Sequence, residues 1–90
     1  MEDRPAEDPR FKAFVLLQAQ NAGLFLGRIP NPSTGVATLN LRAAASVIDS
    51  LEMLASKTRG NLADSESQLL DTVMRNLKPL YEAALAADEA

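Results

Sequence analysis

The side chains that could do chemistry in this sequence are mostly carboxylates. Asp49 and Glu52 are three residues apart in a stretch with helical periodicity, so they lie near each other on one helix face. Such a pair could exchange protons with a substrate or hold a hard cation. Further carboxylates follow at Asp64, Glu66 and Asp71. The alternative is a solvated helix edge whose acids pair with Arg28 or Arg42.

Two residue types that dominate enzyme sites are missing. The chain has no histidine and no cysteine, which removes the commonest general base and the thiolate ligands of soft metals. Serine and threonine hydroxyls are plentiful, but no histidine base and no Ser-x-x-Lys run accompanies them. The sequence therefore predicts no catalytic residue, no metal ligand and no bound cofactor. A small enzyme or metal-dependent site built on the carboxylates is kept as an alternative.

A few basic residues could meet an anion. Lys57 and Arg59 stand beside Gly60, close to the predicted start of the next helix, where unpaired amides attract anions. With Arg75 and Lys78 they could also bind nucleic acid weakly, which is a second alternative. There is no P-loop and no Gly-x-Gly-x-x-Gly run. Because the net charge is −3 and the pI is about 4.8, we expect no nucleic-acid partner.

The elements that must position these side chains are helices. Apolar residues recur at steps of three and four over 41–59 and again over 64–86, which predicts two amphipathic helices. Asn40 and Asp64 are suitable N-caps for them. A further apolar pattern predicts a helix over 10–26. The fold class is therefore all-α, with three helices.

A short corner joins the second and third predicted helices. Lys57 suits the negative end of the helix dipole, and Gly60 suits a left-handed conformation just past the last turn. Asn61 and Leu62 complete this structural turn, with Leu62 folding back onto the helix. A connection this short makes the two helices antiparallel, so we predict a helical hairpin.

A long ordered loop is predicted between the first and second helices. Gly27 suits the position after a helix end, and the run 29–32 is held extended by its prolines. The run 31–35 is a strong turn signal. The segment Val36-Leu39 could be extended, but it has no expected partner strand within the chain and could pair with a second copy. Pro79 predicts a kink in the third helix rather than its end.

These motifs resemble a known family, domain of unknown function 1844, which consists of short bacterial proteins. The resemblance rests on Asn40-Leu41, Ile48-Asp49-x-Leu51-Glu52-x-Leu54, Lys57-Thr58-Arg59-Gly60-Asn61-Leu62, Leu26-Gly27 and Ile29-Pro30-Asn31-Pro32-x-Thr34-Gly35. It implies an all-helical fold and a bacterial origin, and it brings no established activity. Relatives usually carry threonine at the position of Ala63, where it would complete a Thr-x-x-Glu capping box with Glu66.

The first predicted helix has more apolar surface than one face needs. One face is formed by Phe11, Phe14, Val15, Ala22, Phe25 and Leu26, with Gln18 inside it. Leu16, Leu17 and Leu24 fall outside that face, and Leu17 and Leu24 are two turns apart on nearly the same line. We interpret these leucines as an interface with a second copy of the chain. The alternatives are a helix buried on most sides, or a cofactor or lipid groove.

Ninety residues make one domain, with a flexible acidic tail over 1–9 and the helical domain over 10–87. The first ten residues carry four acids, unlike a secretory signal, and no apolar run reaches the ~20 residues that span a bilayer. We therefore expect a cytoplasmic protein without membrane insertion. The leading hypothesis is a non-enzymatic, self-associating interaction module, at least dimeric, with an unidentified protein partner as a further prospect.

Overall fold

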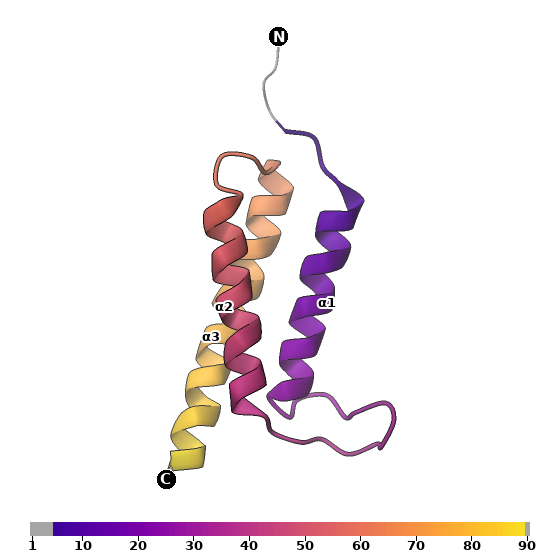
Figure 1. The fold of residues 1–90 in the computed structure, drawn as a ribbon, viewed down its shortest axis with the longest axis vertical. Helices are drawn as coiled ribbons and strands as arrows, with labels where there is room; N and C mark the ends of the chain where they lie inside the picture. The colour runs from indigo at the N-terminus through magenta and orange to yellow at the C-terminus, as the bar shows by residue number, and fades with distance from the viewer. Residues whose placement is uncertain (1–4, 90) are drawn as a thin grey trace.

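Three helices make up the part of the chain that the computed structural model describes, residues 5–89. They are α1 (Pro9–Phe25), α2 (Leu41–Lys57) and α3 (Asp64–Glu89). The helices run alternately down, up and down, with the α2–α3 corner beside the start of α1 and the long loop at the opposite end (Figure 1). The predicted all-α fold, with its hairpin of α2 and α3 and its loop after the first helix, is confirmed.

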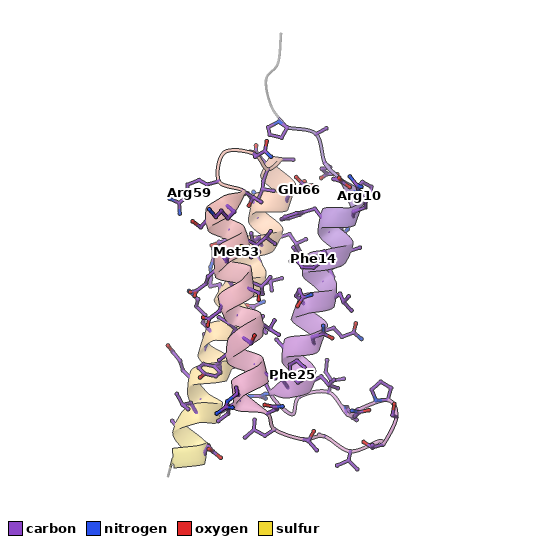
Figure 2. The ribbon with its side chains drawn as sticks, viewed as in Figure 1. Arg10, Phe14, Phe25, Met53, Arg59 and Glu66 are labelled. Atoms are coloured by element: carbon purple, nitrogen blue, oxygen red, sulfur yellow. The ribbon has the colours of Figure 1, made fainter. Side chains whose placement is uncertain are left out.

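All three helices contribute to one apolar core. Its buried members are Val15, Ala22, Leu26, Ala44, Val47, Ile48, Leu51, Leu70, Val73 and Leu77. Most of the predicted inner face of α1 is accordingly buried or packed against this core. Phe14, which is labelled in Figure 2, is the exception, because 47% of its surface is exposed. It sits at the edge of the inner face, so the assignment of Phe14 to the core side was wrong.

Both ends of α1 are capped by local chemistry. Asp8 is the N-cap, and its side chain accepts a hydrogen bond from the backbone amide of Arg10 at 2.9 Å. At the other end Gly27 has φ +73° and donates to the carbonyl of Leu24, while Arg28 donates to the carbonyl of Gly23. These two bonds form a Schellman motif, which places Gly27 just past the helix as predicted.

The two ends of the loop between α1 and α2 lie next to each other. The carbonyl of Asn31 accepts from the amides of Thr34 and Gly35, which forms the predicted turn. Leu39 then makes an isolated antiparallel bridge with Leu26, and Asn40 donates its amide to the carbonyl of Phe25 at 2.6 Å. Val36-Leu39 was expected to have no partner strand within the chain, and it forms no strand, although Leu39 makes this single bridge. Asn40 caps α2 as predicted, accepting from the amide of Ala43 at 3.1 Å.

The second helix ends two residues earlier than predicted. The helix ends at Lys57, because Thr58 is its C-cap and donates both its amide and its hydroxyl to the carbonyl of Leu54. The carbonyl of Thr58 then accepts from Asn61 at 2.8 Å, which closes a four-residue turn. Gly60 occupies the third position of this turn with φ +81°. That is the geometry of a type II turn, so the left-handed glycine is confirmed but lies farther from the helix end.

The start of α3 also shifts by one residue. The carbonyl of Ala63 accepts the first helical bond, from Ser67 at 2.9 Å, so Ala63 is the N-cap position and Asp64 is the first helical residue. The assignment of Asp64 as N-cap was wrong. Pro79 lies inside α3, which continues to Glu89, and the helix therefore does not end at the proline.

Candidate functional site

Large apolar side chains are exposed along α1. Leu17 has 52% of its surface exposed, Leu16 has 45%, and Leu24 is half-buried. On the core side of the same helix Val15 and Ala22 are fully buried. Single exposed apolar residues need no explanation, whereas a contiguous exposed apolar patch is typical of interaction surfaces.

Four residues of α1 lie along one strip that runs beside its core-facing side. Phe14, Leu17, Asn21 and Leu24 follow one another at steps of three, four and three, and we call them the α1 stripe. Leu17 comes two residues after Val15, and Leu24 two after Ala22. At 3.6 residues per turn, each leucine therefore points roughly opposite to its buried neighbour.

The three leucines predicted as an interface do not share one face. Leu17 and Leu24 belong to the α1 stripe, but Leu16 lies about 100° around the helix from Leu17. Phe14 and Asn21 were not predicted as members of the stripe. The alternating three- and four-residue spacing was present in the sequence, but Phe14 was placed on the inner face and Asn21 was not singled out.

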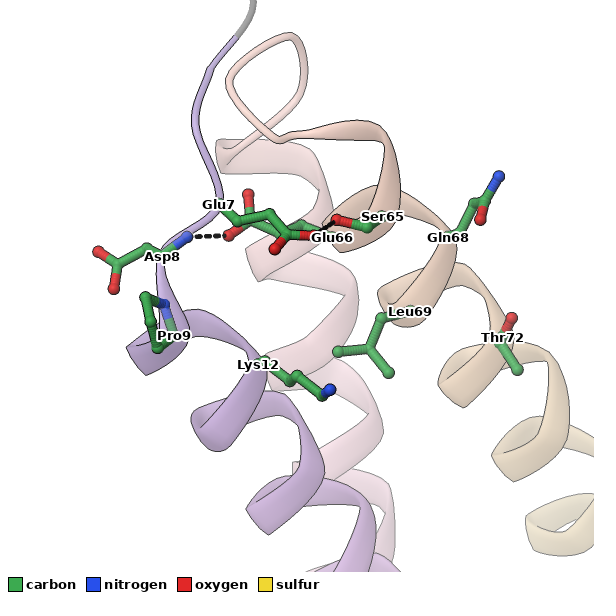
Figure 3. Close-up of a pocket in the computed structure, with 9 residues that line it drawn as sticks. All are labelled: Glu7, Asp8, Pro9, Lys12, Ser65, Glu66, Gln68, Leu69 and Thr72. Atoms are coloured by element: carbon green, nitrogen blue, oxygen red, sulfur yellow. Dashed lines mark hydrogen bonds between the residues drawn. The ribbon is translucent and has the colours of Figure 1, made fainter.

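A buried carboxylate joins the starts of α1 and α3. Glu66 is 6% exposed, and its two oxygens accept from two backbone amides: Ala63 at 3.0 Å and Asp8 at 2.8 Å. Figure 3 shows this junction, where the hydroxyl of Ser65 also donates to the carboxylate of Glu7. Residues 7 and 8 of the predicted tail are thus hydrogen-bonded to α3, while residues 1–4 of that tail lie outside the described part.

A groove of about 550 Å³ opens beside this junction, between the start of α1 and the first turns of α3. Its lining includes Lys12, Leu69 and Thr72 (Figure 3). Asp8, at its rim, has its pKa lowered from 3.8 to about 2, chiefly by hydrogen bonds from the Arg10 side chain and backbone. Both Asp8 and Glu66 are therefore engaged as caps, which gives them a structural role.

The carboxylates predicted on α2 lie at its surface. Asp49 and Glu52 are both exposed, and Glu52 forms an ion pair with Lys78 of α3 at 2.5 Å. The partner of Glu52 is thus neither Arg28 nor Arg42, the two arginines that the sequence suggested. Within residues 5–88, carboxylate side chains do not gather in any group of three or more that could hold a metal ion.

The basic residues do not gather in one place. Lys57 and Arg59 are exposed at the α2–α3 corner, beside the structural turn that Asn61 and Leu62 complete. Arg75 is paired with Asp71 along α3, and Lys78 is paired with Glu52. Two of the four cations proposed for weak nucleic-acid binding are therefore already matched by carboxylates.

The comparisons with known proteins give one finding. The sequence model of a family described as "Domain of unknown function (DUF1844)" matches residues 8–83. No curated protein and no solved structure matches the chain. In the described residues, none of the helices combines the length and the apolar character needed to cross a membrane.

Proposed function

We propose that this chain, which belongs to the DUF1844 family of domains of unknown function, is a non-enzymatic interaction module that associates with itself through α1. The observation that carries the proposal is the exposure of Leu17, at 52%, and Phe14, at 47%, on a helix whose opposite side builds the core.

The energetics favour covering this surface. Full burial of a leucine or phenylalanine side chain is worth roughly 1.5–3 kcal/mol over leaving it in water. A 90-residue domain has a modest core, so the gain is large relative to its stability. A second copy is the simplest cover, because a two-fold interface needs only one self-complementary patch.

The polar groups support a role other than catalysis. The one described carboxylate that is buried, that of Glu66, is engaged by two backbone amides. Glu52 is engaged by Lys78, and the sequence has neither histidine nor cysteine. Groups held in this way stabilise the fold, and they offer no poised acid, base or nucleophile.

We place this module in a bacterial cytoplasm. The absence of cysteine suits a compartment in which disulfides do not form. The bacterial origin rests on the family resemblance described above. A further protein partner could bind the self-associated module, and the groove beside Lys12 and Leu69 is the site that we propose for it.

The test is the mass of the protein in solution. Light scattering at micromolar concentration should give at least twice the 9.7 kDa of one chain, whereas the variant with Leu17→Glu and Leu24→Glu should give one chain with its helix content preserved. Met53→Glu is the matched control, because Met53 is 55% exposed but lies on α2. A wild-type mass near 9.7 kDa would overturn the proposal.

A further inference from the structure

We infer that two copies of the chain pair through α1 in parallel and in register, with Asn21 of one copy facing Asn21 of the other. The inference rests on the proposed self-association and adds the geometry of the contact. It starts from the spacing of the α1 stripe, which is that of two helices packed side by side.

The α1 stripe has the alternation of a coiled-coil seam. Phe14 and Asn21 are seven residues apart, as are Leu17 and Leu24, so they occupy the a and d positions of a heptad. These are the positions whose side chains insert between those of a facing helix. A partner helix would therefore meet four layers: Phe14, Leu17, Asn21 and Leu24.

The surroundings of the stripe favour a second copy as the partner. No charged residue occurs from 13 to 27, although 23% of the whole chain is charged. The outer flank of the stripe is formed by Ala13 and Gln20, which are uncharged. Within the four layers, two copies can therefore approach without bringing like charges together, and depletion of charge is typical of interface centres. Arg10, one heptad before Leu17, lies beyond these layers and is paired with Asp8.

Asn21 decides between the two possible orientations. In the antiparallel arrangement that keeps four layers, Phe14 meets Leu24 and Asn21 meets Leu17 of the other copy. The amide of Asn21 would then be buried against leucine without a partner, which is costly. In the parallel arrangement the two Asn21 amides meet, and the oxygen of one accepts from the nitrogen of the other. A single asparagine at an a position fixes register in this way.

Disulfide trapping tests the orientation, because the chain has no natural cysteine. Phe14→Cys and Leu24→Cys are made as separate variants, each oxidised alone and as an equimolar mixture in which one variant carries a mass tag. In the parallel pair each cysteine faces its own copy. In the antiparallel pair the same cysteines lie about 15 Å apart along the axis, at 1.5 Å per residue, which no disulfide can span.

The expected result is that each variant alone shifts mainly to twice its mass on a non-reducing gel. Leu16→Cys, which lies off the stripe, should stay mainly at the mass of one chain. If the wild type is dimeric but only the mixture gives tagged heterodimers, the pairing is antiparallel and this inference is wrong while self-association stands. If the wild type is a monomer by light scattering, both proposals fail.

Asn21→Leu provides a second readout that does not depend on oxidation. Removing the amide should strengthen association and allow both the parallel and the antiparallel orientation. In this background, Phe14→Cys and Leu24→Cys should therefore also cross-link to each other in the mixture. Unchanged cross-linking, with each cysteine still trapping only its own copy, would show that Asn21 does not set the orientation.

Discussion

Glu66 accepts a hydrogen bond from the backbone amide of Asp8, 58 residues earlier, at 2.8 Å. The same carboxylate accepts from Ala63 at 3.0 Å, so one buried side chain satisfies an amide at the start of α3 and another at the start of α1. Glu66 is the acid of a capping box that lacks its N-cap hydroxyl, because Ala63 stands at that position. The same carboxylate also holds α1 to the hairpin of α2 and α3.

Glu66→Ala should destabilise the fold by about 2–3 kcal/mol, since it leaves two amides of the junction without a charged acceptor. Glu66→Gln should cost about 1–2 kcal/mol, because its amide oxygen can still accept one of the two bonds. Urea denaturation followed by circular dichroism gives both values. Gln68→Ala is the control at an exposed site on the same helix, and an equal loss there would rule out this role for Glu66.

The Asp8–Arg10 pair should make the stability of the fold depend on pH in the acidic range. The pKa of Asp8 is lowered from 3.8 to about 2, chiefly by its hydrogen bond to the Arg10 side chain. A lowered folded-state pKa means that the ionised form stabilises the fold above pH 3.8, and that this contribution is lost as the pH falls through about 2. Arg10→Gln should raise the pKa of Asp8 toward 3.8 in an NMR titration of its carboxyl carbon. Arg75→Gln should leave that pKa unchanged, because Arg75 pairs with Asp71.

Gly60→Val should cost on the order of 1–2 kcal/mol, and Gly60→Asn should cost less, because asparagine tolerates the left-handed region better than a β-branched residue. A Cβ at Gly60 would meet no atom within 4 Å, so the penalty arises from the backbone alone. Thermal unfolding of the two variants compares them. Equal losses would mean that the φ of +81° is not what requires glycine at this corner.

Ala63→Thr should stabilise the protein by about 0.5–1 kcal/mol, because the new hydroxyl can accept a first-turn amide of α3 and complete the box with Glu66. Ala63→Val has the same branched shape without the hydroxyl and should give no such gain. The two melting temperatures, measured side by side, separate capping from packing. A gain shared by both variants would point to packing around Ala63.

The sequence predicted the helices better than the contacts between distant residues. Periodicity located all three helices, and glycine chemistry located the turns at Gly27 and Gly60, because both signals are local. The bond between Asp8 and Glu66 and the pairing of Leu39 with Leu26 join residues far apart in the chain. Neither follows from local spacing, since each depends on where the packed helices bring their ends.

The candidate site was predictable in part. The excess of leucine on α1 was visible from spacing, but the exposure of Phe14 was not. Phe14 lies at the margin of the inner face, where the crossing of neighbouring helices decides whether a ring is covered. The pairing of Glu52 with Lys78 likewise depends on the register of α2 against α3, which the sequence leaves open.

The return of the loop at Leu39 and Asn40 has a consequence for how the chain can vary. Asn40 donates its amide to the carbonyl of Phe25, and Leu39 forms an isolated β-bridge with Leu26. Because these contacts bring its two ends together, the segment 28–38 is an Ω-type loop whose tip does not set the distance between α1 and α2. Its closure entropy grows slowly, by about 0.6 kcal/mol for each doubling of length. The residues around Ser33 are therefore a suitable place to insert a peptide tag or a fluorescent label, since the loop between α1 and α2 lies at the end of the molecule opposite the α2–α3 corner (Figure 1).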